Sequence, residues 1–136
     1  MSVTNNPPVA PYLMVRGGAR AVVWYGRAFG AVETERYDMD DGRLGHSSLS
    51  INGGQIMLSD EFPEFAAAVG TSAPVTLGGT TVTINMRVDD VDAWFDRAIA
   101  EGAEPIRPPQ DEFYGRHGKL RDPYGHVWSI TGPTVA

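Results

Sequence analysis

Hydrophobic residues alternate with polar ones along several short segments of this chain, and at two places they recur every three or four residues instead. Alternation is typical of β-strands, whereas the longer spacing is typical of an amphipathic helix. Gly30 and Gly102 are natural helix ends, and Asp90 is a favourable N-cap. The pattern predicts helices at 18–29 and 91–101 and strands at 10–15, 31–37, 44–51, 55–59, 81–88 and 103–106, with two more strands flanking a turn at 122–125.

The predicted order of strand, helix and three strands occurs twice, and the two halves are also similar in sequence. Trp24–Phe29 matches Trp94–Ile99, and Gly53–Leu58 matches Gly125–Ile130, an offset of 125 − 53 = 72 residues. This repeat is too long for a solenoid unit, so two βαβββ modules in one domain are predicted. We expect a flexible arm at 1–8 and a single domain at 9–136, with modules at about 9–60 and 81–131 and a connecting loop at about 61–80.

Composition limits the class of protein. The chain has 136 residues, of which 42% are hydrophobic, and this is enough to build the core of one domain. Its net charge of −6 and its lack of a basic stripe argue against a nucleic-acid partner. No apolar run approaches the roughly 18 residues of a membrane span, and the first eight residues do not resemble a secretory signal. The absence of cysteine excludes disulfides and fits a cytoplasmic protein.

Six short motifs follow one another over residues 9–131: they are Pro11–Val15, Trp24–Ala31, Met57–Glu61, Leu77–Thr80, Val88–Ala93 and Asp122–Trp128. This ordered set resembles the vicinal oxygen chelate superfamily, which includes glyoxalase I, the bleomycin resistance proteins and the extradiol dioxygenases, and most of all its PhnB-like branch. The resemblance implies an α+β fold in which two βαβββ modules form a curved mixed sheet around a cavity. It also implies that a homodimer often completes the fold.

Strand alternation divides the predicted sheet into two faces. One face is wholly apolar, from Leu13 through Val82 to Trp128, and we expect it to form the core beneath the helices. The opposite face mixes polar groups with methionine and tyrosine, which favours a cavity for a small-molecule ligand over a solvated sheet face. Its candidate ligand-binding residues are Tyr12, Met14, His46, Gln55, Met57, Asn85, Arg87 and Ser129.

The resemblance also raises the question of a metal site. Most enzymes of the vicinal oxygen chelate superfamily hold a divalent metal with His and Glu side chains. Matched by motif, the four ligand positions carry Ala10, Met57, Thr83 and Ser129, and none of these supplies an imidazole or a carboxylate. We therefore expect no metal and no other cofactor. A displaced divalent-metal site built from His46, His117 and either Asp60 or Glu61 remains the alternative.

Arg116 and His117, just after Phe113 and Tyr114, are the neighbouring polar residues best suited to acid–base chemistry. Histidine is a general acid or base near neutral pH, and arginine orients a carboxylate or enolate. PhnB-like sequences often carry Gly-Asp-Arg in this stretch, and here the Asp is missing. A solvated loop is the alternative, so Arg116 and His117 are candidate catalytic residues, and Phe113 and Tyr114 are candidate ligand contacts.

These observations favour a metal-free small-molecule-binding protein of the glyoxalase/bleomycin resistance type, which sequesters an antibiotic-like or natural-product ligand as a homodimer. A metal-independent acid–base enzyme acting on a small natural product is the second hypothesis. The third is a metal-dependent lyase or dioxygenase with displaced ligands. The sequence identifies neither the ligand nor whether the modules pair within one chain or between two chains.

Overall fold

The computed structural model describes residues 7–135, and it confirms the α+β class and the two βαβββ modules. Module 1 forms a four-stranded sheet in the order β1-β4-β3-β2, with β1 parallel to β4 and the other neighbours antiparallel. Most of the predicted arm lies outside the described residues. The elements of module 1 are β1 (Tyr12–Val15), α1 (Gly18–Phe29), β2 (Val32–Asp38), β3 (Leu44–Ile51) and β4 (Gly54–Asp60).

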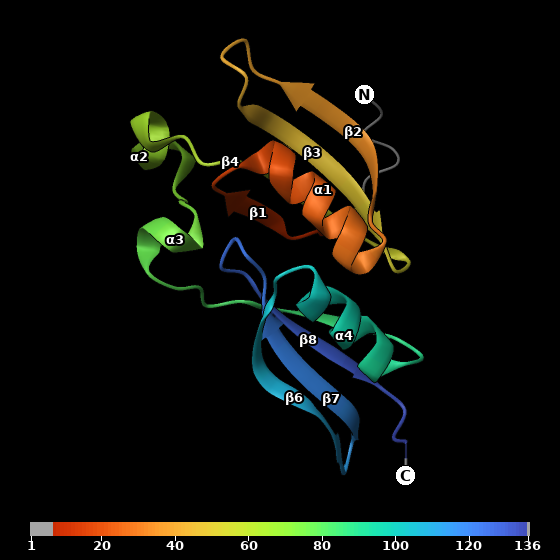
Figure 1. Cartoon of the computed structure of the whole chain (residues 1–136). Helices are drawn as coiled ribbons and strands as arrows, with labels where there is room; N and C mark the ends of the chain where they lie inside the picture. Colours follow the sequence, from red (N-terminus) through yellow and green to blue (C-terminus); the bar gives the residue numbers. More distant parts are fainter. Residues whose placement is uncertain (1–6, 136) are drawn as a thin grey trace.

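Module 2 repeats this topology in a second four-stranded sheet, in the order β5-β8-β7-β6. Figure 1 shows the two modules one above the other, each with its helix lying across its own sheet. The sixth strand is longer than the sequence pattern predicts, because its polar residues continue the ladder with the next strand as far as Glu112. The elements are β5 (Thr83–Arg87), α4 (Val91–Ala100), β6 (Glu104–Glu112), β7 (Gly115–Arg121) and β8 (Val127–Gly132).

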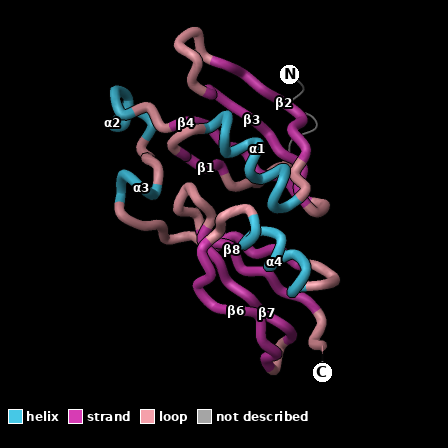
Figure 2. Tube along the Cα trace, viewed as in Figure 1, coloured by secondary structure: helices cyan, strands magenta, loops and turns pink. Residues whose placement is uncertain are grey.

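The segment between the modules is not the irregular loop that the sequence predicts. It contains three single turns of helix, η2 (Pro63–Phe65), α2 (Ala66–Val69) and α3 (Pro74–Leu77), which stand apart from the two sheets in Figure 2. Glu61 holds the segment to β1: its carboxylate accepts hydrogen bonds from Arg16 at 3.0 Å and from the Thr76 hydroxyl at 2.7 Å. Pro63 and Pro74 begin two of these turns, and Gly70 and Gly78 end two of them.

A single hydrophobic core joins the two modules beneath α1 and α4, which lie against each other. The predicted apolar face supplies most of it, including Leu49, Leu58 and Ile130, which are fully buried. Val82 is an exception: it precedes β5 and is exposed, so its predicted place in the core is wrong. Among residues 7–135, no helix is long and apolar enough to cross a membrane.

Candidate functional site

The polar face of module 2 gathers candidate residues from three adjacent strands. Parallel pairing of β5 with β8 sets Asn85 beside Ser129 and Arg87 beside Thr131. Antiparallel pairing of β7 with β8 sets His117 beside Thr131 on the other side. Because alternate residues of a strand share a face, all five side chains lie on the face opposite the core. The ladder register therefore brings together residues that are 46 positions apart in sequence.

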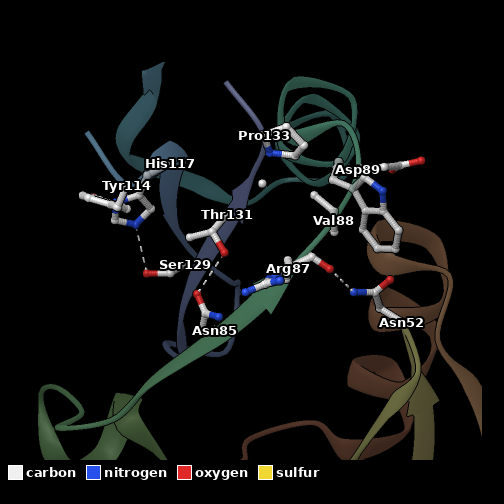
Figure 3. A pocket seen from close by; sticks show the side chains of 12 residues that line it. Asn52, Asn85, Arg87, Val88, Asp89, Tyr114, His117, Ser129, Thr131 and Pro133 are labelled. Atoms are coloured by element: carbon white, nitrogen blue, oxygen red, sulfur yellow. Dashed lines mark hydrogen bonds between the residues drawn. The ribbon is translucent and has the colours of Figure 1, made fainter. Parts of the chain in front are cut away.

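A cavity of about 1100 Å³ lies on this face, and Figure 3 shows its lining. Hydroxyl, amide, imidazole, guanidinium and carboxylate groups share it with two large aromatic rings, a mixture that is typical of small-molecule sites. The lining residues are Asn52, Asn85, Arg87, Val88, Asp89, Trp94, Tyr114, His117, Ser129, Thr131, Gly132 and Pro133.

His117 is held on both sides of its ring. Nδ1 lies 2.8 Å from the Tyr114 hydroxyl, and Nε2 lies 3.1 Å from the Ser129 hydroxyl (Figure 3). Partial burial lowers the pKa of His117 below 6.5, and the positive charges of Arg107 and Lys119 lower it further. The imidazole is therefore neutral at pH 7, with one nitrogen able to accept a proton.

Arg87 is an exposed residue that lines the cavity together with one carboxylate, that of Asp89. Its backbone carbonyl accepts a 2.6 Å hydrogen bond from the Asn52 side chain, which ties the β3–β4 turn of module 1 to module 2. In Figure 3 its side chain lies between Asn85 and Asn52, and within residues 7–135 its guanidinium has no hydrogen bond or ion pair. An unpaired guanidinium in a concave site is suited to a carboxylate or another anionic group.

The predicted pairing of Arg116 with His117 does not form. Both residues belong to β7, so their side chains point to opposite faces of the sheet. The Arg116 guanidinium instead binds Asp92 of α4 at 3.0 Å and Asp111 of β6 at 3.2 Å. It stabilises the contact between helix and sheet and is not available to orient a ligand beside His117.

The predicted residues of module 1 lie outside this cavity. Tyr12 and Met14 line a separate cavity of about 270 Å³, and Gln55 lines one of about 300 Å³ between the modules. His46 and Met57 are half-buried on the polar face of the module 1 sheet. The cavity at Gln55 adjoins the large one, since Asn85 and Arg87 line both, whereas the cavity at Tyr12 and Met14 shares no lining residue with it.

Phe113 and Tyr114 form the β6–β7 turn and differ in position. Phe113 is fully exposed at its tip, with its ring edge-on to that of Tyr114, and it does not line the cavity. Tyr114 does line it and contacts His117. Asn52 and Trp94 also line the cavity but are not among the residues predicted from the sequence, because a turn residue and a helix residue give no local sign of a ligand.

The four positions where the superfamily's metal ligands are expected do not suit a metal, because none carries an imidazole or a carboxylate. The displaced site is also not assembled: His46 and His117 lie on different sheets, and Glu61 is bound by Arg16 and Thr76. Asp60 accepts hydrogen bonds from three backbone N–H groups, those of Gly17, Gly18 and Leu44. Across residues 7–135, no three His, Asp or Glu side chains converge as a metal site would require.

Comparison with known proteins agrees with this fold. A family model described as Glyoxalase/Bleomycin resistance protein/Dioxygenase superfamily matches residues 8–130. Uncharacterized protein Rv0887c of Mycobacterium tuberculosis is 41% identical over 134 residues, which cover 98% of this chain and 78% of that protein.

Two solved structures are similar over nearly the whole chain. TioX from Micromonospora sp. ML1 has a TM-score of 0.69 at 29% identity, with 96% of this chain and 98% of that chain covered. Fosfomycin resistance protein FosX from Mesorhizobium loti has a TM-score of 0.66 at 16% identity, with 95% and 93% covered, and at that identity it shows the fold alone. The chain therefore belongs to the glyoxalase/bleomycin resistance protein/dioxygenase superfamily.

Proposed function

We propose that this chain is a metal-free small-molecule-binding protein that holds an antibiotic-like or natural-product ligand in the module 2 cavity. The observation that carries the proposal is the Arg87 guanidinium, which lines that cavity and has no hydrogen bond or ion pair within residues 7–135. A cation without a partner on a concave surface is stabilised by any ligand that brings an anionic group to it.

The other lining groups define the ligand further. Asn85, Ser129 and Thr131 supply hydrogen bonds beside Arg87, and Trp94 and Tyr114 supply flat apolar surfaces. Rings flanked by polar groups are suited to a planar ring that carries a carboxylate or several carbonyl oxygens. Although the overall net charge is −6, the local positive charge of Arg87 favours an anionic group at this position.

We also propose a homodimer and membership of the PhnB-like branch. The cavity is open on one side in a single chain, and a second copy covering that side would enclose it. The ordered motifs over residues 9–131 support the branch. Light scattering on the purified chain tests the dimer: a monomer at micromolar concentration would remove that part of the proposal.

Calorimetric titration tests the ligand class. The probes are bleomycin and two planar carboxylates, 1-naphthoate and indole-3-acetate. We expect binding of at least one probe to weaken about tenfold or more in Arg87→Ala, because a charge-assisted contact is lost. Arg20→Ala is the matched control, since Arg20 is exposed on α1 and does not line this cavity. Equal affinity of Arg87→Ala and wild type for every probe that binds would overturn the assignment.

An acid–base enzyme in the same cavity is the second candidate, and the neutral His117 between Tyr114 and Ser129 favours it. A neutral imidazole held in place by two hydroxyl groups is arranged to accept a proton from a bound substrate. His117→Gln separates the two candidates once a ligand is found. Loss of turnover with binding retained supports the enzyme, whereas stoichiometric recovery of unchanged ligand from the wild type supports binding alone.

A further inference from the structure

The internal repeat places a second histidine in module 1 at the position equivalent to His117. The register that pairs Ser47 with Leu58 sets His46 beside residue 59, just as His117 lies beside residue 131, and 131 − 59 = 72 is the repeat offset. Both imidazoles are held alike. Nδ1 of His46 lies 2.8 Å from the Tyr12 hydroxyl, and Nε2 lies 3.2 Å from the Ser48 hydroxyl.

The two modules differ in the charge that lies beside the imidazole. In module 1, Glu35 of β2 lies beside Ser48 of β3. At the equivalent position of module 2, Arg107 of β6 lies beside Lys119 of β7. Glu35 Oε2 is 3.6 Å from Nε2 of His46. His46 therefore faces a carboxylate where His117 faces two cations.

Glu35 has no other stabilising partner within residues 7–135. Both of its carboxylate oxygens are shielded from solvent and accept no hydrogen bond. Arg36, its neighbour in sequence, pairs with Glu33 and Asp38 instead. A shielded carboxylate is costly without a donor, and the closest ionisable donor is the Nε2–H group of His46. Glu35 therefore faces Nε2 of His46 as the acceptor for a proton carried on that nitrogen.

We propose that Tyr12, His46 and Glu35 form a proton-transfer site on module 1, separate from the Arg87 cavity, with Tyr12 as the catalytic residue. The Tyr12 hydroxyl proton passes to Nδ1 of His46, and the resulting imidazolium is stabilised by Glu35. The phenolate oxygen then takes a proton from a carbon atom next to a carbonyl group of the substrate, and His46 returns its proton to the product. His46 and Glu35 are positioning residues that act through Tyr12, in the manner of a base oriented by a third group.

The surroundings of Tyr12 allow a small substrate to reach it. Tyr12 is 43% exposed, and with Met14 it lines the cavity of about 270 Å³ whose other wall includes Ser72 and Thr80 of the linker. Burial raises the pKa of Tyr12, despite a hydrogen bond with Ser59 that lowers it, so the phenol keeps its proton until a base removes it. The site therefore needs an adjacent base, which the structure supplies at 2.8 Å.

Labelling by phenylmethanesulfonyl fluoride tests the proposal in the full chain. The Tyr12 oxygen forms a bond to sulfur, fluoride leaves, and the phenolic proton passes to His46. Tyr114 is an internal control, because its hydroxyl is also 2.8 Å from a histidine Nδ1, but the charges that act most strongly on that histidine are the cations Arg107 and Lys119. We expect peptide mass spectrometry to show Tyr12 reacting about tenfold or more faster than Tyr114.

Variants and spectroscopy complete the test. Glu35→Gln is expected to lower the ratio of Tyr12 to Tyr114 labelling severalfold, with Glu35→Asp restoring part of it, and His46→Phe to reduce Tyr12 to the rate of the exposed Tyr37. Nitrogen-15 spectra of the wild type are expected to show neutral His46 protonated on Nε2. A wild-type ratio near one, or the opposite tautomer, would overturn the proposal without any variant. Arg20→Ala, on a helix surface away from both cavities, leaves the labelling ratio unchanged. The ratio is measured without any ligand of the Arg87 cavity, so failure of the ligand-binding proposal is recognised separately.

Discussion

The Tyr25 hydroxyl donates a 2.5 Å hydrogen bond to Oδ2 of Asp122, and this contact joins the helix of module 1 to the β7–β8 turn of module 2. Trp128 Nε1 donates to the same oxygen at 2.9 Å, and two backbone N–H groups of the turn donate to Oδ1. Asp122 is therefore a buried carboxylate with four donors, and such groups stabilise a unique arrangement when every bond is made. The turn also orients β8, which carries Ser129 and Thr131 into the candidate site.

We predict that Tyr25→Phe lowers the free energy of unfolding by about 1.5–3 kcal/mol, because it removes one hydrogen bond to a buried charge and changes little else. Asp122→Asn is expected to cost at least as much, since its amide cannot accept from all four donors. Urea denaturation followed by circular dichroism measures both values. Tyr37→Phe is the control: Tyr37 is 64% exposed, and its removal should change stability by less than about 0.5 kcal/mol.

We also expect the chain to lose stability in alkaline solution because of Tyr25. Burial raises the pKa of Tyr25 well above its usual value, and the charge of Asp122 and their hydrogen bond raise it further. The unfolded chain therefore loses this proton first, at about pH 10, while the folded chain still holds it. We expect the free energy of unfolding to fall as pH rises above about 10 and to fall less steeply in Tyr25→Phe. Identical slopes in both proteins would show that Tyr25 is not the group responsible.

Much of the fold follows from local pattern. The helix predicted at 18–29 has those bounds in the structure, and Asp90 accepts the N-cap hydrogen bond from the Ala93 backbone. The sequence repeat predicted both modules correctly, because its two copies have turns at equivalent positions. Alternation placed Asn85, Arg87 and Ser129 on one face, and that face carries the cavity.

What the sequence did not reveal depends on contacts between distant segments or on local irregularities. The Arg116–His117 pair fails because the side chains of neighbouring strand residues diverge. The sequence predicts a strand before the turn at 122–125 but does not show that it begins as early as Gly115. Glu35 was missed because β2 contains a bulge between Glu33 and Glu35, and the bulge changes which residues face which side. Asn52 enters the site only through the tertiary contact of its turn with Arg87.

We predict that Gly125→Ala destabilises the chain more than Gly42→Ala. Both glycines have a φ of +91°, so an alanine would have the same backbone strain at either position. A Cβ at Gly125 would lie 2.7 Å from the Pro74 side chain, whereas a Cβ at Gly42 meets nothing within 4 Å. The difference between the two variants, about 1–3 kcal/mol by thermal or urea unfolding, measures how closely the linker packs on the turn. Equal destabilisation would mean that α3 moves aside without cost.

The last prediction concerns the loss of stability in acid that is due to His117. Burial, Arg107 and Lys119 hold the pKa of His117 below 6.5, so the folded chain resists its protonation. As pH falls below about 6.5 the unfolded chain takes up this proton first, and the stability due to the neutral imidazole is lost as pH falls toward the folded pKa.

A two-dimensional carbon–proton NMR titration of the three histidines measures that pKa. Lys119→Gln is expected to move it upward, toward 6.5, because one positive charge is removed. Arg121→Gln is the matched control, since Arg121 pairs with Glu104 and is not among the charges that lower the pKa of His117. A wild-type pKa at or above 6.5 would contradict the assignment. A pKa well above 7 would also remove the neutral base on which the proposed catalysis in the module 2 cavity depends, because a protonated His117 has no free nitrogen to accept a proton.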